Sequence, residues 1–407
     1  MTVAGAHTPF VAIACGGTGG HLFPGLAVAE QLQKRGCTVV LLVSPKDVDQ
    51  EAVKSAQGME IFKLPAVGLQ NRNYFAFAGS FVKSLFAARK IFRKHRPDAV
   101  LAMGGFTSAP PVWVGKEFGA KTFLHESNTI PGRANRFLAR FVDEAFVGFP
   151  TAAERLRARK VTTTGTPVRP QFRWGEAADE PARGDARATI IAECCTALGF
   201  EPDRPVVLVT GGSQGASGLN DMILSALPSL GDRASAWQWL HLTGPADVEK
   251  VKQVYATHRC KAVVKSFMAE MDLALGAATV AVSRAGASSL AEIAAMRLPS
   301  LLVPYPAAAD NHQFYNAQAF AETGAARLLE QKTATPEKVA ALLRELVEEP
   351  VARGKIQTAL AQWHTPGAAA QIANIMLATI AQRQEESPTR KSSCNCGHTH
   401  GPAKHAH

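Results

Sequence analysis

The 407-residue chain contains no stretch of about 18 uninterrupted apolar residues, the length that a membrane-spanning helix requires. Its N-terminus also lacks the basic segment and the apolar stretch of a signal peptide. We therefore expect neither a membrane span nor a secretion signal. The seven cysteines are odd in number and irregularly spaced, at positions 15, 37, 194, 195, 260, 394 and 396. This pattern favours reduced thiols in a cytoplasmic protein over a disulfide framework.

Acidic residues are fewer than basic ones, 34 against 44, and the formal net charge is +10 at pH 7. The excess favours an anionic partner, which charge alone leaves open between a phosphate-bearing substrate, a nucleic acid and an acidic lipid surface. The aromatic-plus-basic strand motif of RNA-binding proteins is absent, so we expect no nucleic-acid partner. A chain of this length predicts about two domains.

A glycine-rich segment, Gly16-Gly17-Thr18-Gly19-Gly20-His21, separates an apolar strand at 10–14 from an amphipathic stretch at 22–35. Such a turn lets the backbone and the helix N-terminus hold a phosphate. It fits neither the G-x-G-x-x-G template, because Leu22 stands at the last glycine position, nor a P-loop, because no Lys-Ser/Thr pair follows. The second strand, 38–43, also lacks the acidic ribose ligand of an NAD site. The segment is either an anion site or only a tight connection.

Short apolar strands alternate with helical stretches in both halves of the chain. This pattern predicts doubly wound parallel sheets, whose ligands bind at the carboxyl ends of the strands. The expected strands beyond the first two lie at 99–103, 121–124, 145–147, 206–210, 238–242, 262–264, 279–282 and 300–303. The opening pattern of strand, glycine turn and helix recurs at Gly211-Gly212-Ser213-Gln214-Gly215.

A stretch rich in proline, glycine and charge follows Thr166 and predicts a linker. We therefore predict two similar α/β domains that face a cleft, at residues 1–169 and 170–384, with the last helix packing back on the first domain. The tail, 385–407, is polar and expected to be disordered. Its cysteines and histidines, from Cys394 to His407, are metal-ligand types, but their spacing does not match a structural zinc finger.

Residues 74–96 combine aromatic and basic side chains without any Asp or Glu. The aromatic and other large apolar residues are Tyr74, Phe75, Phe77, Phe81, Leu85, Phe86 and Phe92, and the basic ones are Lys83, Arg89, Lys90, Arg93, Lys94 and Arg96. One interpretation is a half-buried core helix with a solvated basic face. The other is an interfacial helix that inserts into the headgroups of an anionic membrane surface.

The segment from Ser283 to Glu292 follows an expected strand and presents small residues, two hydroxyls and then a glutamate. Small residues leave room for a diphosphate at the helix start, and Glu292 is suited to accept both ribose hydroxyls of a nucleotide. An ordinary N-capped helix explains the same pattern. The segment from Asp310 to Asn316 follows the next strand, at the same sheet edge, where amide side chains suit sugar hydroxyls.

Together these motifs resemble the MurG family of glycosyltransferases, which transfer N-acetylglucosamine (GlcNAc) from UDP-GlcNAc to the lipid-linked muramyl-pentapeptide of peptidoglycan synthesis. Seven motifs occur in the family's order between about residues 10 and 380: Gly16 to Gly25, Met103 to Phe106, His125 to Asn128, Pro167 to Arg169, Gly211 to Ala216, Arg284 to Glu292, and Asp310 with Gln313 and Asn316. One motif would be weak, whereas seven in order are specific.

The resemblance implies an α/β protein with the GT-B glycosyltransferase fold, two Rossmann-like parallel-sheet domains that face a cleft. It implies a donor site mainly in the C-terminal domain: uracil near Phe267 and Met268, ribose on Glu292, the diphosphate on Ser213, Ala287, Ser288 and Ser289, and GlcNAc near Asn128 and Gln313. The turn with Thr18, Gly19 and Gly20 would face the acceptor's diphosphate. The implied substrates are UDP-GlcNAc and an undecaprenyl-linked muramyl-pentapeptide, at the cytoplasmic face of the plasma membrane.

An inverting transfer needs a base with a pKa near neutrality. His21 is the candidate, because an imidazole has an ordinary pKa of about 6.5; its alternative role is only to hydrogen-bond the acceptor's diphosphate. Arg169 is expected to meet the charge that grows on the leaving phosphate. Since no Asp-x-Asp pair stands in a suitable context, we expect no required metal or other cofactor.

Three positions depart from the family pattern: Ser127 and Thr166 replace a common Gln and Asn, and His312 stands where a second Gln is common. The last change leaves open which side chain contacts the sugar hydroxyls. Two other functions also stay open, another GT-B lipid glycosyltransferase, such as a diacylglycerol sugar transferase, and a non-catalytic membrane-associated UDP-sugar sensor.

Overall fold

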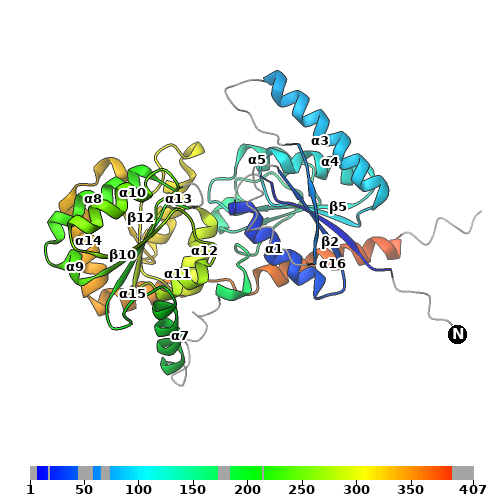
Figure 1. Ribbon diagram of the computed structural model, residues 1–407. Helices are drawn as coiled ribbons and strands as arrows, with labels where there is room; N and C mark the ends of the chain where they lie inside the picture. The colour runs from blue at the N-terminus through cyan, green and yellow to red at the C-terminus, as the bar shows by residue number, and fades with distance from the viewer. Residues whose placement is uncertain are drawn as a thin grey trace, which may run out of the picture.

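The computed structural model describes residues 7–16, 19–44, 58–65, 74–172, 184–212 and 215–386. These residues form two α/β domains that lie side by side, each built on one parallel sheet (Figure 1). Thr18, Ser213 and the tail from residue 387 lie outside the described residues. The predicted domain boundaries at residues 169 and 384 stay predictions.

The N-terminal sheet has seven strands in the order β3-β2-β1-β4-β5-β6-β7, and every neighbouring pair is parallel. Its strands are β1 (Phe10–Ala14), β2 (Thr38–Val43), β3 (Glu60–Lys63), β4 (Ala99–Ala102), β5 (Lys121–Glu126), β6 (Glu144–Val147) and β7 (Val161–Thr163). Its helices are α1 (Gly19–Gln33), α3 (Tyr74–Lys94), α4 (Ala109–Glu117), α5 (Arg133–Leu138) and α6 (Pro150–Ala153). Ile13 of β1 lies opposite Leu41 on one side and Leu101 on the other.

The C-terminal sheet has six parallel strands in the order β10-β9-β8-β11-β12-β13. They are β8 (Val206–Thr210), β9 (Gln238–Leu242), β10 (Lys261–Lys265), β11 (Val280–Ser283), β12 (Ser300–Leu302) and β13 (Arg327–Leu328). The helices from here on are α7 (Gly184–Ala197), α8 (Ser217–Leu230), α9 (Arg233–Ala236), α10 (Val248–Thr257), α11 (Met271–Ala277), α12 (Ala287–Met296), α13 (His312–Glu322), α14 (Pro336–Glu348), α15 (Pro350–Ala361) and α16 (Ala368–Glu386).

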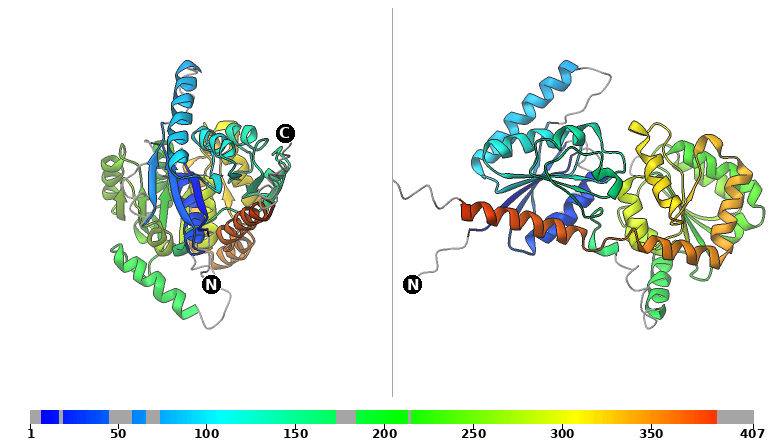
Figure 2. Two further views of the ribbon diagram at one scale, coloured as in Figure 1. Left: turned by 90° about the vertical axis from the view of Figure 1, so that its right-hand side faces the viewer. Right: turned by 180° about the vertical axis from the view of Figure 1, so that it is seen from behind.

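Alternate residues of the central strands pack on opposite faces of the N-terminal sheet, as the two-residue period of a strand requires. Val11 and Ile13 share a core with residues of α1 and α16, whereas Ala12 and Ala14 share one with residues of α3 and α4. The final helix therefore crosses back to the first domain (Figure 2), where Asn374 accepts a hydrogen bond from Arg35 at 2.8 Å.

The expected strands are all present, four of them with the expected ends and the others with ends shifted by one or two residues, and three further strands occur. These are the edge strands β3, β7 and β13, which are short and expose several side chains, so no apolar run marks them in the sequence. β5 continues two residues beyond the expected end, through His125 and Glu126, because both side chains are satisfied inside the protein. Among the described residues no helix is long and apolar enough to span a bilayer.

Candidate functional site

Each sheet has a point where the strand order reverses, between β1 and β4 in the first domain and between β8 and β11 in the second. In doubly wound folds, ligands bind beyond the carboxyl ends of the strands at this reversal. Gly16 and Gly104 follow β1 and β4, while Gly211 and Gly286 follow β8 and β11. The glycine motifs therefore fall at the two places where the topology favours a ligand.

The glycines after β4 make room for His21. Gly104 has a φ of 124°, and a Cβ there would lie 2.7 Å from His21 Cε1. Gly105 has a φ of 76°, and its Cβ would lie 3.1 Å from the carbonyl oxygen of Gly16. Both positions thus need glycine for backbone conformation and for space. The Met103 to Phe106 motif seats the imidazole of His21 in the first turn of α1.

His125 is fully buried beside this turn and is held neutral. Burial lowers the pKa of its imidazole, and the nearby His21 lowers it further. Its Nε2 lies 3.0 Å from the Gly165 carbonyl, which can only accept, so Nε2 carries the proton. Nδ1 therefore accepts a hydrogen bond from the Ser127 hydroxyl at 3.2 Å. Ser127, one of the departures from the family pattern, thus fixes the orientation of a buried histidine.

Glu126 organises the loop between β5 and α5 with both carboxylate oxygens. Oε1 accepts from the backbone N–H and the side-chain amide of Asn128, at 2.8 and 3.0 Å. Oε2 accepts from the Gly132 N–H at 2.9 Å and the Asn135 amide at 2.8 Å. Because the carboxylate is almost fully buried, these four hydrogen bonds replace the water that it loses on folding.

Asn316 joins the two domains through a fully satisfied amide. Its Oδ1 accepts from both the N–H and the hydroxyl of Thr129, each at 2.9 Å. Its Nδ2 donates to Asn128 Oδ1 at 3.0 Å and to the Ala285 carbonyl at 3.1 Å. The residue is fully buried, so each of these bonds lies in a low-dielectric setting where losing a partner is costly.

The amide groups of Asn128 are therefore engaged in this structure by Glu126 and Asn316. These bonds use one of the two Nδ2 hydrogens and one of the two Oδ1 lone pairs, which leaves one of each for the expected contact of Asn128 with GlcNAc. Nearby, Arg136 and Arg133 of the first domain lie 2.7 and 3.5 Å from Asp310 of the second, in partly exposed ion pairs. Asp310 itself has a φ of 50°, in the left-handed region that few side chains adopt.

Arg169 lies at the junction of the domains, 6% exposed, between two aromatic rings. Its guanidinium carbon is 4.1 Å from the ring centre of Phe23 in α1 and 5.1 Å from that of Phe172. Its Nε and Nη2 atoms are buried and find no hydrogen-bond partner among the described residues. Burial lowers the pKa of Arg169, and the negative charge of Glu292 opposes that change. A buried donor without an acceptor suits an anionic ligand.

Glu292 lies in α12 and is half-buried. Loss of water around its carboxyl raises the pKa to about 7, although the positive charge of Arg169 acts in the opposite direction. No described residue donates a hydrogen bond to this carboxylate. Its acceptor capacity is thus available to a ligand, as the expected ribose contact requires.

The start of α12 meets the start of α1 across the domain junction. Ser288 donates a hydrogen bond from its hydroxyl to the Gly20 carbonyl at 2.7 Å. Gly286, the residue before the helix, supplies no side-chain cap to the first N–H groups of α12. The helix start therefore keeps backbone donors and the positive end of its dipole next to the residue that precedes His21.

Gln313 has one half of its amide engaged and the other half available. Its Oε1 accepts from the Tyr305 N–H at 2.9 Å and the Ala285 N–H at 3.3 Å, while no described residue accepts from its Nε2. His312 uses Nδ1 to donate to the Ala309 carbonyl at 2.7 Å, at the start of α13. Of Gln313 and His312, Gln313 is thus the residue whose side-chain N–H group is available near the carboxyl end of β11.

The remaining expected residues are dispersed along the sheet edge. Phe267 and Met268 follow β10, the outermost strand on that side, with Phe267 37% exposed and Met268 buried. Ala287 and Ser289 lie in the first turn of α12, and Gly19 and Gly20 begin α1. Thr18 and Ser213, expected to contact phosphates, lie outside the described residues.

Sequence reasoning missed the interdomain role of Asn316 and the loop-organising role of Glu126, although both belong to motifs that it identified. The first-domain partners of Asn316 lie 187 and 188 residues away in the sequence, so spacing gives no signal for them. The partners of Glu126 lie only two to nine residues away, but they meet its carboxylate only when the loop after β5 is folded. Arg284 is likewise structural: it donates to the Val303 and Pro304 carbonyls, each at 3.1 Å, and to Gln331 Oε1 at 2.7 Å. Within the described ranges, no group of three His, Cys, Asp or Glu residues is arranged to hold a metal ion.

Two doubly wound parallel-sheet domains, joined by the hydrogen bond from Ser288 at the start of α12 to Gly20 at the start of α1, define the GT-B fold. The chain matches the glycosyltransferase family 28 N-terminal domain over residues 11–147 and the family 28 C-terminal domain over residues 206–372. The chain belongs to glycosyltransferase family 28.

Curated relatives resemble nearly the whole chain. A UDP-N-acetylglucosamine–N-acetylmuramyl-(pentapeptide) pyrophosphoryl-undecaprenol N-acetylglucosamine transferase from Anaeromyxobacter sp. (strain Fw109-5) is 35% identical over 397 residues, covering 96% of this chain and 98% of the relative. The protein of that name from Myxococcus xanthus (strain DK1622) is 32% identical over 382 residues, 91% and 93% of the two chains. The crystal structure of Acinetobacter baumannii MurG superposes with a TM-score of 0.67 at 26% identity, covering 91% of this chain and all of that one.

Proposed function

We propose that the protein is an inverting glycosyltransferase that moves GlcNAc from UDP-GlcNAc to the 4-hydroxyl of the N-acetylmuramyl group of a pentapeptide pyrophosphoryl-undecaprenol. The relatives that carry this activity in their names align with more than nine-tenths of the chain. The structural observation that carries the proposal is the 2.7 Å hydrogen bond from Ser288 to Gly20. It brings the start of α12, where the diphosphate of UDP-GlcNAc is expected to bind, next to the candidate base, His21.

The donor nucleotide is assigned to the C-terminal domain. The ribose hydroxyls bind the Glu292 carboxylate, which has no donor among the described residues, and uracil packs against the exposed Phe267 ring. The diphosphate binds the N–H groups at the start of α12, and Ser288 exchanges the Gly20 carbonyl for a phosphate oxygen. GlcNAc takes the available Nε2 donor of Gln313. Ser213 is assigned to the diphosphate on the family motif alone.

The acceptor's pyrophosphate is assigned to the turn of Thr18, Gly19 and Gly20 at the start of α1, because the first N–H groups of a helix have no partner within the helix and suit an anion. His21 takes the proton of the acceptor hydroxyl as that oxygen attacks the anomeric carbon. The displacement is single, so the configuration at this carbon inverts and UDP departs. The contact with Gly104 supports this role, because it limits the positions that the imidazole can occupy.

Arg169 is assigned to the leaving diphosphate. It stays close to Glu292 and carries two buried N–H groups that lack partners among the described residues. As UDP leaves, negative charge grows on the phosphate oxygens, and a guanidinium fixed between Phe23 and Phe172 meets that charge without reorganising. Transfer by this scheme uses no metal and no other cofactor.

The protein is proposed to work as a peripheral enzyme on the cytoplasmic face of the plasma membrane, where its lipid-linked acceptor lies. α3 supports this location, because Phe75 is 93% and Phe86 65% exposed on a helix without acidic residues. Large exposed aromatics next to basic residues are typical of interfacial helices. Nucleic acid is not among the proposed partners.

Acceptor choice tests the proposal. The purified chain is incubated with labelled UDP-GlcNAc and, in parallel, with a muramyl-pentapeptide pyrophosphoryl lipid or with diacylglycerol. Label in the muramyl lipid alone is the expected result. Label in diacylglycerol would instead identify the protein as a diacylglycerol sugar transferase. Binding of UDP-GlcNAc without any turnover would identify it as a UDP-sugar sensor.

A further inference from the structure

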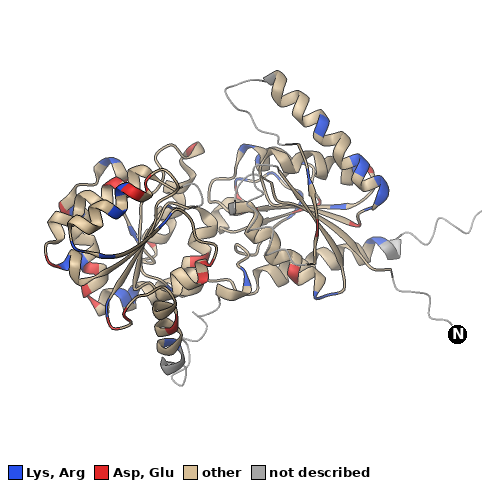
Figure 3. Cartoon of the chain, in the orientation of Figure 1, with Lys and Arg blue, Asp and Glu red and all other residues tan. Residues whose placement is uncertain are grey.

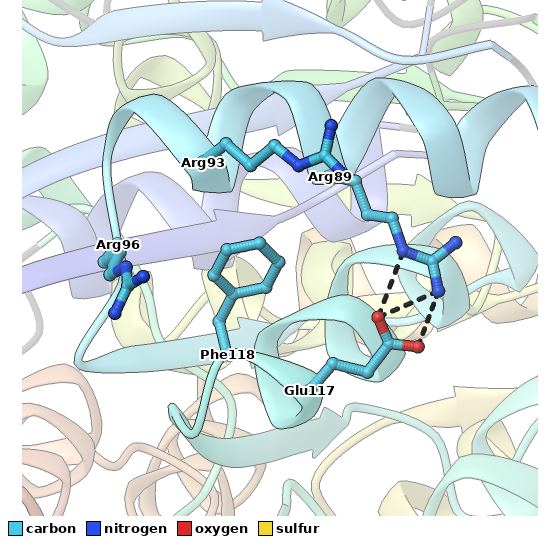
Figure 4. Close-up of a pocket in the computed structure, with 5 residues that line it drawn as sticks. All are labelled: Arg89, Arg93, Arg96, Glu117 and Phe118. Carbon is cyan, nitrogen blue, oxygen red and sulfur yellow. Dashed lines mark hydrogen bonds and ion pairs between the residues drawn. The ribbon is translucent and has the colours of Figure 1, made fainter.

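The basic end of α3 forms a cavity of about 390 Å³ (Figure 4). It is lined by Arg89, Arg93, Arg96, Glu117 and Phe118. Figure 3 shows the basic residues gathered at this end of the helix. The cavity belongs to the surface of α3 that the proposed function already assigns to the membrane. The core of the C-terminal domain, in contrast, holds polar groups to which the proposed transfer gives no role.

Three of these polar side chains meet beside β9. Asn220 of α8, His241 of β9 and Tyr255 of α10 are each at most 1% exposed. His241 Nε2 lies 3.0 Å from Asn220 Oδ1, and His241 Nδ1 lies 3.1 Å from the Tyr255 hydroxyl. Polar groups buried in this way need partners within the protein, and here each has one.

The partners of Asn220 fix the direction of these bonds. Its Nδ2 lies 3.0 Å from the Thr243 carbonyl and 2.8 Å from the Asp247 carboxylate, and both of these groups only accept. Asn220 Oδ1 is therefore an acceptor, so His241 Nε2 carries the proton and Nδ1 accepts from the Tyr255 hydroxyl. Burial lowers the pKa of His241 to about 3, which keeps the imidazole neutral. The group thus has one fully satisfied arrangement.

Asn220 ties both ends of the loop after β9 to the start of α8. Thr243 directly follows β9, and Asp247 directly precedes α10. Asp247 also accepts a hydrogen bond from the side chain of Ser217, at the start of α8, and the bonds from Ser217 and Asn220 lower the pKa of Asp247. The position of this loop is therefore fixed by α8.

Gly215, the last glycine of the motif after β8, packs against the same loop. A Cβ at Gly215 would lie 2.5 Å from Gly244 Cα and would collide with the Thr243 carbonyl. Gly215 also has a φ of 73° and donates from its N–H to the Gly212 carbonyl at 3.0 Å, so the position needs glycine. Ala216 supplies no side-chain cap, which leaves the first N–H groups of α8 available at the reversal of strand order.

We propose that Asn220 and His241 are positioning residues for the donor. They fix the loop at 243–247 so that Gly215 and the first turn of α8 hold the diphosphate of UDP-GlcNAc. Because both side chains are buried, neither touches the donor: His241 orients Asn220, and Asn220 holds the loop. This proposal rests on the donor assignment given under the proposed function and extends it to residues behind the glycine motif.

The test compares Asn220→Ala with Gln238→Ala. Gln238 is a matched control, because it is a fully buried amide at the other end of β9 that also holds a loop. It accepts from the Glu201 N–H at 2.9 Å and donates to the Glu201 and Arg204 carbonyls at 2.8 and 3.1 Å. Both variants should lower the melting temperature. Only Asn220→Ala should weaken the binding of UDP, measured by titration calorimetry, by about tenfold, as expected for one lost hydrogen bond to a phosphate.

Steady-state turnover separates positioning from a merely structural role. Asn220→Ala should raise KM for UDP-GlcNAc by about tenfold and leave kcat close to that of wild type. A merely structural loss would reduce the amount of active protein, so the apparent kcat would fall at an unchanged KM. That result would overturn the proposal, as would an unchanged affinity of Asn220→Ala for UDP or an equal loss of affinity in Gln238→Ala.

A second variant keeps the test decisive even where Asn220→Ala does not fold. Asn220→Asp retains the shape and the acceptor for His241, but it sets a second carboxylate against Asp247. It should weaken UDP binding, and adding Asp247→Asn should recover most of the affinity by restoring a donor opposite the carboxylate. Normal UDP affinity in Asn220→Asp alone would overturn the proposal. Wild-type protein that binds UDP but transfers no GlcNAc would contradict the proposed function and leave this comparison of UDP affinities valid.

Discussion

The carboxyl group of Glu292 is predicted to weaken the ligand-free fold while it serves nucleotide binding. Its pKa is about 7 in the folded protein, against an ordinary value of 4.5, because burial removes water from the carboxylate. The folded state therefore binds this proton more tightly than the unfolded chain does. Stability from this group is largest below pH 4.5 and falls as the pH rises through about 7.

The size of the change in the free energy of unfolding follows from the difference between the pKa of Glu292 in the folded protein and its ordinary pKa. At pH 5 the carboxyl destabilises the folded protein by about 1 kcal/mol, and at pH 8 by about 3 kcal/mol. Glu292→Gln keeps the shape of the side chain and removes the charge. The variant should gain about 2 kcal/mol over wild type between pH 5 and pH 8, which is roughly 4 to 8 °C in the melting temperature for a domain of this size.

The assay is the melting temperature of wild type and variant at both pH values, with Glu349→Gln as the control because Glu349 is exposed. The control should show no such pH dependence. In parallel, Glu292→Gln should weaken UDP binding by about tenfold or more, since a hydrogen bond to a charged group is worth about 1.5 to 3 kcal/mol. An equal melting-temperature difference at both pH values would refute the claim that burial of the charged Glu292 carboxylate destabilises the folded protein. Normal UDP affinity would place the ribose elsewhere.

Three other substitutions test the site. His21→Ala should lower kcat far more than it raises KM for UDP-GlcNAc in steady-state assays; an unchanged kcat would remove His21 from the chemistry. Gly104→Ala places a methyl group 2.7 Å from His21 at a positive φ, so it should lower both turnover and the melting temperature. The control is Gly79→Ala in α3, where a Cβ would have no neighbour within 4 Å. This control should leave turnover unchanged and stabilise the helix by about 1 kcal/mol. Asn316→Ala leaves Thr129 without its acceptor and should destabilise the protein by about 1 to 3 kcal/mol in denaturant titrations; a neutral effect would show that the interdomain hydrogen bonds are dispensable.

The architecture was predictable because the information is local. A buried parallel strand reads as a short apolar run, and β1, β2, β8 and β9 have the ends that the sequence predicts. β3 could not be found this way, since Glu60 and Lys63 flank only two apolar residues on an edge strand. The glycine motifs of the sequence do fall at the carboxyl ends of strands next to both reversals of strand order.

The hydrogen-bond partners of the residues in the site were less predictable. Asn128 and Ser288 were expected to face the donor, but in this structure they bond to Asn316 and Gly20 of the opposite domain. Such contacts join segments that are far apart in the sequence, and which polar side chains pair depends on how the domains meet. The tautomer of His125 likewise depends on a carbonyl 40 residues away.

The stereochemistry of the transferred sugar tests the central claim most directly. The purified chain is given UDP-GlcNAc, in which the sugar is α-linked, and a soluble muramyl-pyrophosphoryl acceptor, and the anomeric proton of the product is read by NMR before any equilibration. A single displacement assisted by His21 predicts a β-linked GlcNAc on the muramyl 4-hydroxyl. An α-linked product would contradict the inverting mechanism, and the absence of transfer would contradict the assigned reaction.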